Sequence, residues 1–251
     1  MTVGPGFSAG ISLAAAQQTA VVLAAGPLMA WFNSTVGLVQ SGGVVSSWTD
    51  VRGGLVAVPN GAVAPGYTAS GGSNGRPAVV SDTSQTEGLS VAVGTTLLST
   101  TNGYTMLVRA QHGSEPAIFA DLAAFASATR VLCAVGTNSS RNGISTARKA
   151  TADTSTTTTG TGAVDALWHT YGTVVDFVAG TVRYLVDNVV IATANLSAGA
   201  GVVAGGESCG LGILCNPDGG NNAAATVSEV LFYGAPLPAY QLALLNTYLA
   251  R

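Results

Sequence analysis

The sequence predicts an all-β sandwich that ends in a short C-terminal helix. Short runs of β-branched residues alternate with Gly, Asn, Asp and Ser, which is typical of strands joined by turns. Helical periodicity is nearly absent before the last turns of the chain. The chain has 251 residues, of which 47% are hydrophobic, so it can bury the core of one large β domain.

Composition excludes two broad classes of protein. Charged residues make up 8% of the chain, against roughly 25% in an average globular protein, whereas a disordered chain is rich in charge. The net charge of −3, with scattered Lys and Arg, leaves no basic surface for nucleic acid. So few charges do little to keep separate molecules in solution, and we expect a protein that works in an assembly.

The uncharged start of the chain predicts neither a membrane span nor an export signal. Residues 1–49 carry no charged side chain. Glutamines and a Gly26-Pro27 break interrupt the apolar stretch Ile11–Phe32, so it cannot be a spanning helix. A signal peptide requires a basic N-terminal region, and no basic residue precedes Arg52. We therefore expect synthesis in the host cytoplasm without a signal peptide.

Two domain segments are predicted. Residues 27–251 form the β-sandwich domain, and residues 1–26 lie outside it. The N-terminal segment is interpreted either as an arm that docks on a neighbouring subunit or as an extra strand of the same sandwich.

Turn signals and β-branched runs place the elements between these ends. Gly53–Gly75 and Ala150–Gly162 are low in complexity and are predicted to be exposed loops, although the Thr-rich second stretch could also form an edge strand. The clearest hairpin spans Thr181–Ala194, where Asp187 and Asn188 tolerate the positive φ of a tight turn. Further strands are predicted at Tyr104–Ala110, Arg130–Gly136, Ala166–Phe177, Leu211–Cys215 and Thr226–Tyr233.

One helix is predicted, from Pro238 to Ala250, because proline suits the first helical position and loses no hydrogen bond there. Its apolar stripe should lie against the sandwich. The stripe consists of Tyr240, Leu244 and Tyr248, widened by Leu242, Leu245 and Leu249.

The three cysteines are an odd number without the spacing of a disulfide framework. On one extended strand, Cys209 and Cys215 would lie about 20 Å apart, too far for a disulfide. We expect Cys133, Cys209 and Cys215 to be reduced and buried. Zinc is disfavoured because the cysteines and the two histidines lack ligand spacing.

Several motifs, taken in order, resemble one known family. Leu28–Phe32, Gly42–Asp50 and Asn74–Val79 resemble the opening of the laminin-G-like, concanavalin-A-like jelly-roll domains. Later segments are similar to the family's Trp-His strand, its hairpin, its last strand and its closing helix. These segments are Leu167–His169, Arg183–Asp187, Val227–Tyr233, Leu237-Pro238 and Leu245–Leu249.

The resemblance covers Leu28–Arg251 and implies a concanavalin-A-like jelly-roll sandwich. The chain departs from the family pattern at Val80–Thr83, where Phe, Asp and Gly are usual, and at Asn188, where the turn usually has Gly. Such domains occur in secreted lectins, in glycan hydrolases and in virion proteins of tailed phages. The fold alone therefore does not choose the function.

No catalytic residues, and hence no enzyme, are predicted. A glucanase of this family would supply two carboxylates from one strand in a Glu-x-Asp-x-Glu type pattern, and the sequence has no such cluster. A pair of acids brought together only by the fold stays open. Neither histidine accompanies a Gly-x-Ser-x-Gly motif. His112 is expected in a loop, and the resemblance gives His169, next to Trp168, a packing role.

One polar loop could bind Ca²⁺ through oxygen ligands. The loop contains a single carboxylate, so a plain turn is favoured and no metal or other cofactor is predicted. The ligands would be Asn216, Asp218, Asn221 and Asn222.

Sugar binding would call for exposed aromatic side chains, for which Tyr67 and Tyr104 are the candidates. Trp31, Trp48 and Trp168 are interpreted as core residues, with Trp48 the most exposed of the three.

Taken together, these features favour a structural, non-enzymatic virion protein of a tailed phage. It would be a capsid decoration or a tail or fibre component that acts through protein-protein assembly. Its partners would be other virion proteins and copies of itself, with a trimer favoured. The alternative is a lectin-like module that binds a glycan on the host surface.

Overall fold

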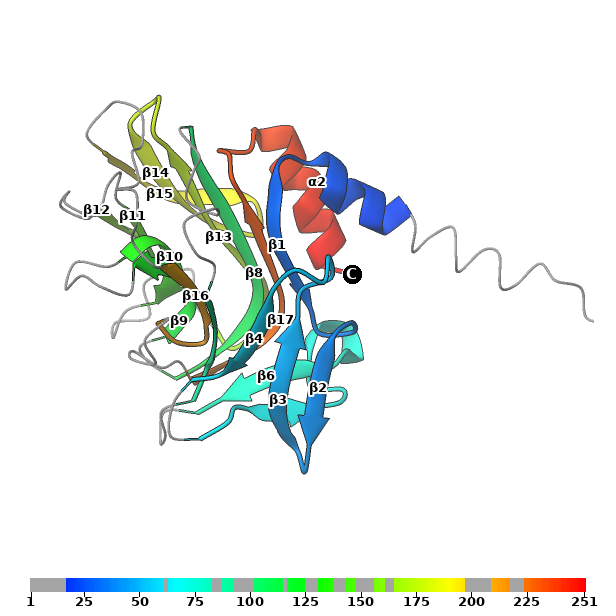
Figure 1. The fold of residues 1–251 in the computed structure, drawn as a ribbon. Coiled ribbons are helices and arrows are strands. Elements are labelled where there is room, and N and C mark those ends of the chain that lie inside the picture. Colours follow the sequence, from blue (N-terminus) through cyan, green and yellow to red (C-terminus); the bar gives the residue numbers. More distant parts are fainter. Residues whose placement is uncertain are drawn as a thin grey trace, which may run out of the picture.

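The protein forms two packed β-sheets, with helices on the outer face of one of them (Figure 1). All pairs between the named strands are antiparallel within the described residues, and the predicted all-β class with a C-terminal helix is confirmed. The computed structural model describes residues 17–60, 63–82, 87–92, 102–114, 117–124, 131–137, 143–147, 156–160, 165–196, 209–216 and 224–251.

The first sheet is organised around its longest pairing, β8 with β17. On one side of this pair the order continues through β13, β14 and β15. On the other side, one half of β17 pairs with β1 and the other half with β6, beyond which lie β5, β3 and β2. The bounds are β1 Leu28–Asn33, β2 Leu38–Ser41, β3 Val44–Thr49, β5 Gly66–Thr68, β6 Ala78–Ser81, β8 Gly103–Ser114, β13 Trp168–Asp176, β14 Thr181–Val186, β15 Val189–Asn195 and β17 Ala224–Tyr233.

The second sheet has the order β4-β7-β16-β9-β10-β11-β12. Strand β4 also pairs with β3, so it joins the two sheets at one end. The bounds are β4 Val56–Pro59, β7 Leu89–Ala92, β9 Ala117–Ala124, β10 Val131–Thr137, β11 Gly143–Ala147, β12 Thr156–Gly160 and β16 Cys209–Ile213.

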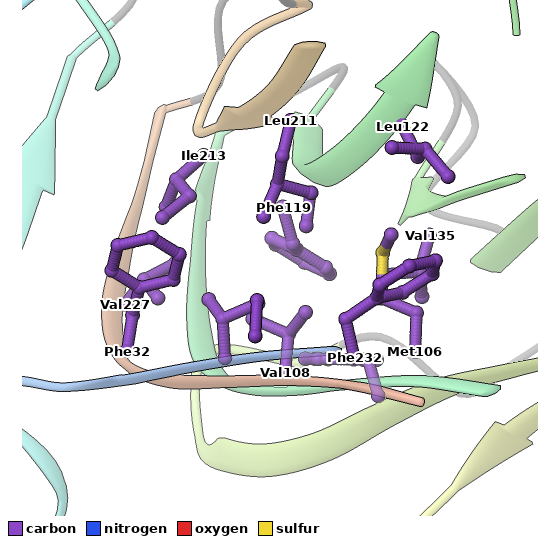
Figure 2. Packing of buried hydrophobic residues seen from close by; sticks show 14 of the residues in the cluster. Phe32, Met106, Val108, Phe119, Leu122, Val135, Leu211, Ile213, Val227 and Phe232 are labelled. Carbon is purple, nitrogen blue, oxygen red and sulfur yellow. The ribbon is translucent and has the colours of Figure 1, made fainter. Parts of the chain in front are cut away.

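The main core lies between the two sheets. Figure 2 shows side chains of the first sheet, among them Met106 and Phe232, facing side chains of the second, among them Phe119 and Leu211. Alternate residues of the same strands point the other way, because successive side chains of a strand leave opposite faces of the sheet. Leu231 thus belongs to a second apolar cluster on the outer face. A strand buried on both faces reads as a continuous apolar run.

The outer face of the first sheet is covered by α2 (Ala239–Leu249) and by a helix of residues 17–24, which lie side by side in Figure 1. The predicted helix is confirmed to within one residue at each end. Its predicted stripe is wrong in part, because Tyr240 is 66% exposed and Leu244 is 54% exposed. The period of 3.6 residues turns these two away from the buried face. That face consists of Leu242, Leu245, Tyr248 and Leu249.

Residues 17–24 form a helix, so this part of the predicted segment 1–26 is not an extra strand of the sandwich, while the docking arm and the boundary at residue 26 stay predictions. Val22 is fully buried in the outer cluster, and the Tyr233 hydroxyl donates a hydrogen bond of 2.9 Å to its carbonyl oxygen. The helical segment has two Gln, two Ala and one Leu, which favour helix, but also Thr and two Val, which do not, so packing against the sheet supplies much of its stability. Residues 1–16 lie outside the described residues. No helix among the described residues is long and apolar enough to cross a membrane.

Both predicted loops contain strands. Gly53–Gly75 includes β4 and β5, and Ala150–Gly162 includes β12. Strand β12 pairs with β11 and ends the order of described strands in its sheet, so the edge-strand alternative is the correct one. The hairpin prediction is confirmed: β14 and β15 are joined by Asp187 and Asn188, whose φ values are 49° and 68°.

Candidate functional site

A buried carboxylate lies beneath the outer cluster. Glu229 of β17 is 2% exposed and lies opposite Asn33 of β1 in the strand register. One carboxylate oxygen, Oε1, accepts hydrogen bonds from Trp31 Nε1 at 2.7 Å and from the Tyr248 hydroxyl at 2.5 Å. It also accepts one from Asn33 Nδ2 at 3.1 Å. A buried charge needs such partners, and these donors come from two elements, β1 and α2.

The Asn33 side-chain amide is fixed in orientation. Its Oδ1 accepts hydrogen bonds from the Thr35 amide at 2.9 Å and the Thr35 hydroxyl at 2.6 Å. Its Nδ2 donates to Tyr248 as well as to Glu229. A group held from both ends keeps one geometry before any ligand arrives, which is a property of preformed binding sites.

Two arginines are brought to the same place by loops far apart in the sequence. Arg76 follows the short 3-10 turn Ser73–Gly75, and its Nη1 lies 3.9 Å from Glu229 Oε2. Arg251 follows α2, and its guanidinium lies 3.5 Å above the Tyr248 ring in a cation-π contact. Asn74, at φ 54°, donates to the Ala250 carbonyl at 3.0 Å and so ties the two loops together.

These groups surround a hollow of about 220 Å³, which we name the arginine hollow. Its lining includes the buried residues Trp31, Asn33 and Tyr248, and Thr35, Arg76 and Arg251 are among its accessible residues. A second hollow of about 330 Å³, lined mainly by apolar atoms of the two helices, adjoins it and shares Gln18, Tyr248 and Arg251. The polar and the apolar hollow are therefore neighbours on one surface.

Burial perturbs the ionisable groups of the arginine hollow. Burial raises the pKa of Glu229, and the hydrogen bonds from Tyr248 and Trp31 together with the two arginine charges offset only part of this rise. Burial likewise raises the pKa of Tyr248 and lowers that of Arg251. The carboxylate thus carries its charge less readily than a solvated Glu, and among the described residues the hollow is lined by two arginines and by no Asp or Glu side chain.

Only part of this site could be predicted from the sequence. Trp31 is 4% exposed, which confirms it as a core residue, but Glu229 counted only as a lone acid. One signal was available: an acid inside the apolar run Val227–Tyr233 must be buried and must find donors. Which donors it finds depends on the register of β1 and β17 and on the path of α2.

The predicted calcium loop lies mostly outside the described residues. Asn216 is half-buried after β16, and Asp218, Asn221 and Asn222 are not described. Within the described part of the chain, no group of three or more His, Cys, Asp or Glu side chains is placed to hold a metal ion.

The aromatic candidates are not available for stacking on a sugar. Tyr104 is 1% exposed, with Phe177 and Phe232 against its ring at centroid distances of 5.5 and 5.6 Å. Tyr67 is half-buried against the main core. Trp48 is fully buried and donates to the Asn33 carbonyl at 3.1 Å, so the prediction that it is the most exposed tryptophan is wrong, and the half-buried Trp168 takes that place.

His112 and Cys215 both lie in the interior. His112 belongs to β8 rather than to a loop, is 3% exposed and contacts Phe119 edge-on. Cys215 is a free, fully buried thiol, as predicted, and burial raises its pKa to about 12, which makes it unreactive. The side chains of Cys133 and Cys209 lie outside the described residues.

His169 has a polar environment instead of the packing role expected for it. Its Nδ1 lies 2.5 Å from Asp187 Oδ2, and its Nε2 lies 2.9 Å from Asp165 Oδ1. Arg109 Nη1 in turn lies 3.8 Å from the other Asp187 oxygen. The fold has therefore brought two distant carboxylates together, but the imidazole ring occupies the space between them.

This arrangement predicts a pH-dependent stability. Burial opposes the charged form of His169, but hydrogen bonds with Asp187 and Asp165 and the charges of both outweigh it, so the pKa of His169 is raised above 6.5. The stabilisation is fully present below about pH 6.5 and is lost as the pH rises through the folded-state pKa. We expect urea midpoints of the wild type to fall between pH 6 and pH 9, and this fall to be smaller in His169→Gln. Parallel pH profiles for the two proteins would contradict the assignment.

No family model matches the sequence, and no curated protein matches it. Among solved structures, a Trypanosoma rangeli sialidase with the inhibitor DANA matches with a TM-score of 0.56 and 12% identity, over 94% of this chain and 37% of the sialidase. A structure of botulinum neurotoxin type C, whose cell entry depends on interaction with two ganglioside molecules, matches with a TM-score of 0.59 and 11% identity. The match covers 89% of this chain and 51% of the neurotoxin chain. The binding domain of botulinum neurotoxin DC, in complex with rat synaptotagmin II, matches with a TM-score of 0.57 and 9% identity, over 88% of this chain and 51% of the matched chain.

The likeness is one of fold. A β-sandwich with these neighbours fits the predicted concanavalin-A-like jelly roll, and the chain spans well under two thirds of each matched chain. At 9–14% identity no activity is transferred.

The prediction that the chain is not an enzyme is corrected by this comparison. Sialidases, including a variant with trans-sialidase activity, are among the structures that share its fold. The prediction relied on the missing Glu-x-Asp-x-Glu and Gly-x-Ser-x-Gly patterns, although it left open a pair of acids brought together by the fold. Each pattern tests a single hydrolase class, and catalytic groups can also come from distant segments, so their absence does not support the conclusion.

Proposed function

We propose that this domain binds carbohydrate in the arginine hollow. The carrying observation is the preformed hollow itself, of about 220 Å³, whose lining includes a fixed amide, the hydroxyl groups of Thr35 and Tyr248 and two guanidinium groups. Its volume is below the range of drug-sized sites and suits a single sugar residue. Similarity in fold to a neurotoxin whose cell entry depends on gangliosides supports the same class of ligand.

Several features of the hollow suit a sugar. Sugar hydroxyl groups both donate and accept hydrogen bonds. At the hollow, Arg76 can donate and the Thr35 hydroxyl, whose proton goes to Asn33 Oδ1, can accept, whereas the Asn33 amide is fully used by Thr35, Glu229 and Tyr248 and acts by holding them in place. The hydrogen bonds within the site hold these groups in place, so a ligand does not have to order them.

Filling the hollow is expected to abolish binding without unfolding the domain. Val36 lines the hollow, is 50% exposed and accepts a larger side chain at its surface. In Val36→Trp we expect the affinity for a bound glycan, first found on a panel of neutral and acidic oligosaccharides, to fall at least about 10-fold because the indole excludes the sugar. Isothermal titration calorimetry measures the change.

Val39→Trp is the matched control, because Val39 is equally exposed, at 53%, but does not line the hollow. Its affinity should equal that of the wild type, and both variants should keep the wild-type melting temperature. A wild-type protein that binds no glycan of the panel at millimolar concentration rejects the proposed function. Binding that survives Val36→Trp places the sugar elsewhere on the molecule.

The predicted place in a tailed-phage virion, with other virion proteins as partners and a trimeric state, stays a prediction. A glycan-binding domain would serve such a particle in attachment to a host surface. Counting copies of this chain in purified particles by quantitative mass spectrometry tests that location, and its absence from particles would reject it.

A further inference from the structure

Two cations face the arginine hollow and are brought close by the fold. Arg76 and Arg251 both line it. Burial lowers the pKa of Arg251, the charges of Tyr248 and Glu229 offset part of this fall, and the charge of Arg76 adds a smaller lowering. Like charges held near each other raise the free energy of the folded protein, and an anion between them relieves this repulsion.

Arg251 also has unsatisfied donors. Its Nε and Nη1 are buried and have no hydrogen-bond partner among the described residues, while the guanidinium plane is held against the Tyr248 ring. Buried donors without acceptors are rare in proteins and call for an explanation. These two nitrogens are closed off from solvent, so Arg251 acts on a ligand in the hollow through the positive charge of its guanidinium rather than through these two N–H groups.

Glu229 does not neutralise both arginines. Its Oε1 is saturated by Trp31, Asn33 and Tyr248, and its Oε2 is 3.9 Å from Arg76, which is too long for a hydrogen bond. Asp50 is 3% exposed and accepts a hydrogen bond from the Trp31 backbone N–H, and neither it nor any other described Asp or Glu side chain lines the hollow. The accessible part of the site therefore keeps unused positive charge.

We infer that the sugar held in the arginine hollow is acidic, with its carboxylate bound by Arg76 and Arg251. This inference rests on the proposed function and narrows it to sugars that carry a carboxylate, such as uronic and sialic acids. A guanidinium presents parallel N–H donors whose geometry matches the two oxygens of a carboxylate. Neutral sugars would leave both cations unpaired and would bind more weakly.

A matched pair of ligands tests the inference. The 4-methylumbelliferyl glycosides of glucuronic acid and of glucose differ only in the carboxylate at C6, and the galacturonic and galactose pair repeats the comparison. We expect the acidic member of at least one pair to bind about 10-fold or more tightly than its neutral partner. This preference should decrease as NaCl is raised from 50 to 500 mM, because salt screens charge pairs.

Charge-removing variants locate the preference. Arg76→Gln and Arg251→Gln should each lower affinity for the acidic glycoside about 10-fold and change the neutral one less than about threefold. Arg183→Gln on β14, outside the hollow, is the matched control and should bind as the wild type does. Arg251→Gln could have a lower melting temperature than the wild type because it loses its contact with Tyr248. In that case Arg76→Gln carries the test, because the Arg76 side chain is 26% exposed.

The outcomes separate the two proposals. Equal binding of acidic and neutral members, with both weakened by Val36→Trp, overturns the inference and leaves carbohydrate binding in the hollow intact. A preference for the acidic member that Arg76→Gln and Arg251→Gln do not alter also overturns it, because the carboxylate then binds elsewhere. Absence of binding to all four glycosides and to the glycan panel overturns both proposals.

Discussion

Replacing Glu229 by alanine is expected to lower the free energy of unfolding by about 3–5 kcal/mol, because it removes the shared acceptor of a buried network. Trp31 Nε1, the Tyr248 hydroxyl and the Asn33 amide all donate to one Glu229 oxygen. Without it, three donors are left without this acceptor beside a new cavity. Urea unfolding at pH 7, followed by tryptophan fluorescence, measures the loss.

Glu229→Gln is the control for this prediction. The amide keeps a carbonyl oxygen for the same donors and removes a charge whose pKa burial has raised, so the stability should change by less than about 1 kcal/mol. Equal losses in the alanine and glutamine variants would show that the charge matters rather than the shared acceptor. A loss below about 1 kcal/mol in the alanine variant would show that the network contributes little to stability.

Replacing Phe119 by alanine is expected to destabilise the domain by about 3–5 kcal/mol, because the phenyl ring fills the space between the sheets. Phe119 is fully buried, and its ring stacks on Tyr171 with a centroid distance of 4.5 Å (Figure 2 shows its place in the core). Backbone pairing on both sides of β9 prevents the sheets from closing over the gap. Thermal and urea unfolding measure the loss.

Val178→Ala is the matched comparison for the core substitution. Val178 is 70% exposed, so its truncation should change stability by less than about 0.5 kcal/mol. A Phe119→Ala protein that unfolds within about 1 kcal/mol of the wild type would mean that the two sheets do not pack as tightly as described.

Local sequence was sufficient for elements whose signals are local. The hairpin β14–β15 was predicted because β-branched arms flank two residues that tolerate positive φ, and α2 because a proline precedes a run of helix-forming residues. The strand β12 was less certain, because a Thr-rich run suits both an edge strand and a loop. The helix of residues 17–24 was missed because its apolar residues show no clear stripe.

The candidate site was largely beyond sequence reasoning. Trp31, Arg76 and Glu229 stood in separate motifs, and no spacing rule relates positions so far apart. Tyr248 was expected to face the sandwich, and it does. Its hydrogen-bond partner, Glu229, could not be predicted from the sequence. Unpaired donors on Arg251 likewise become visible only when the surroundings of its guanidinium are known.

The sequence by itself determined the all-β class, the turn at Asp187 and Asn188, and the C-terminal helix, because backbone preference and hydrophobic period act over a few residues. Only the tertiary structure decided that Glu229 would meet donors from β1 and α2, and that Arg76 and Arg251 would face one hollow. The physical reason is that burial, hydrogen bonding and charge repulsion depend on distances in space. In an antiparallel sandwich those distances are set by strand register and layer packing between segments some 200 residues apart.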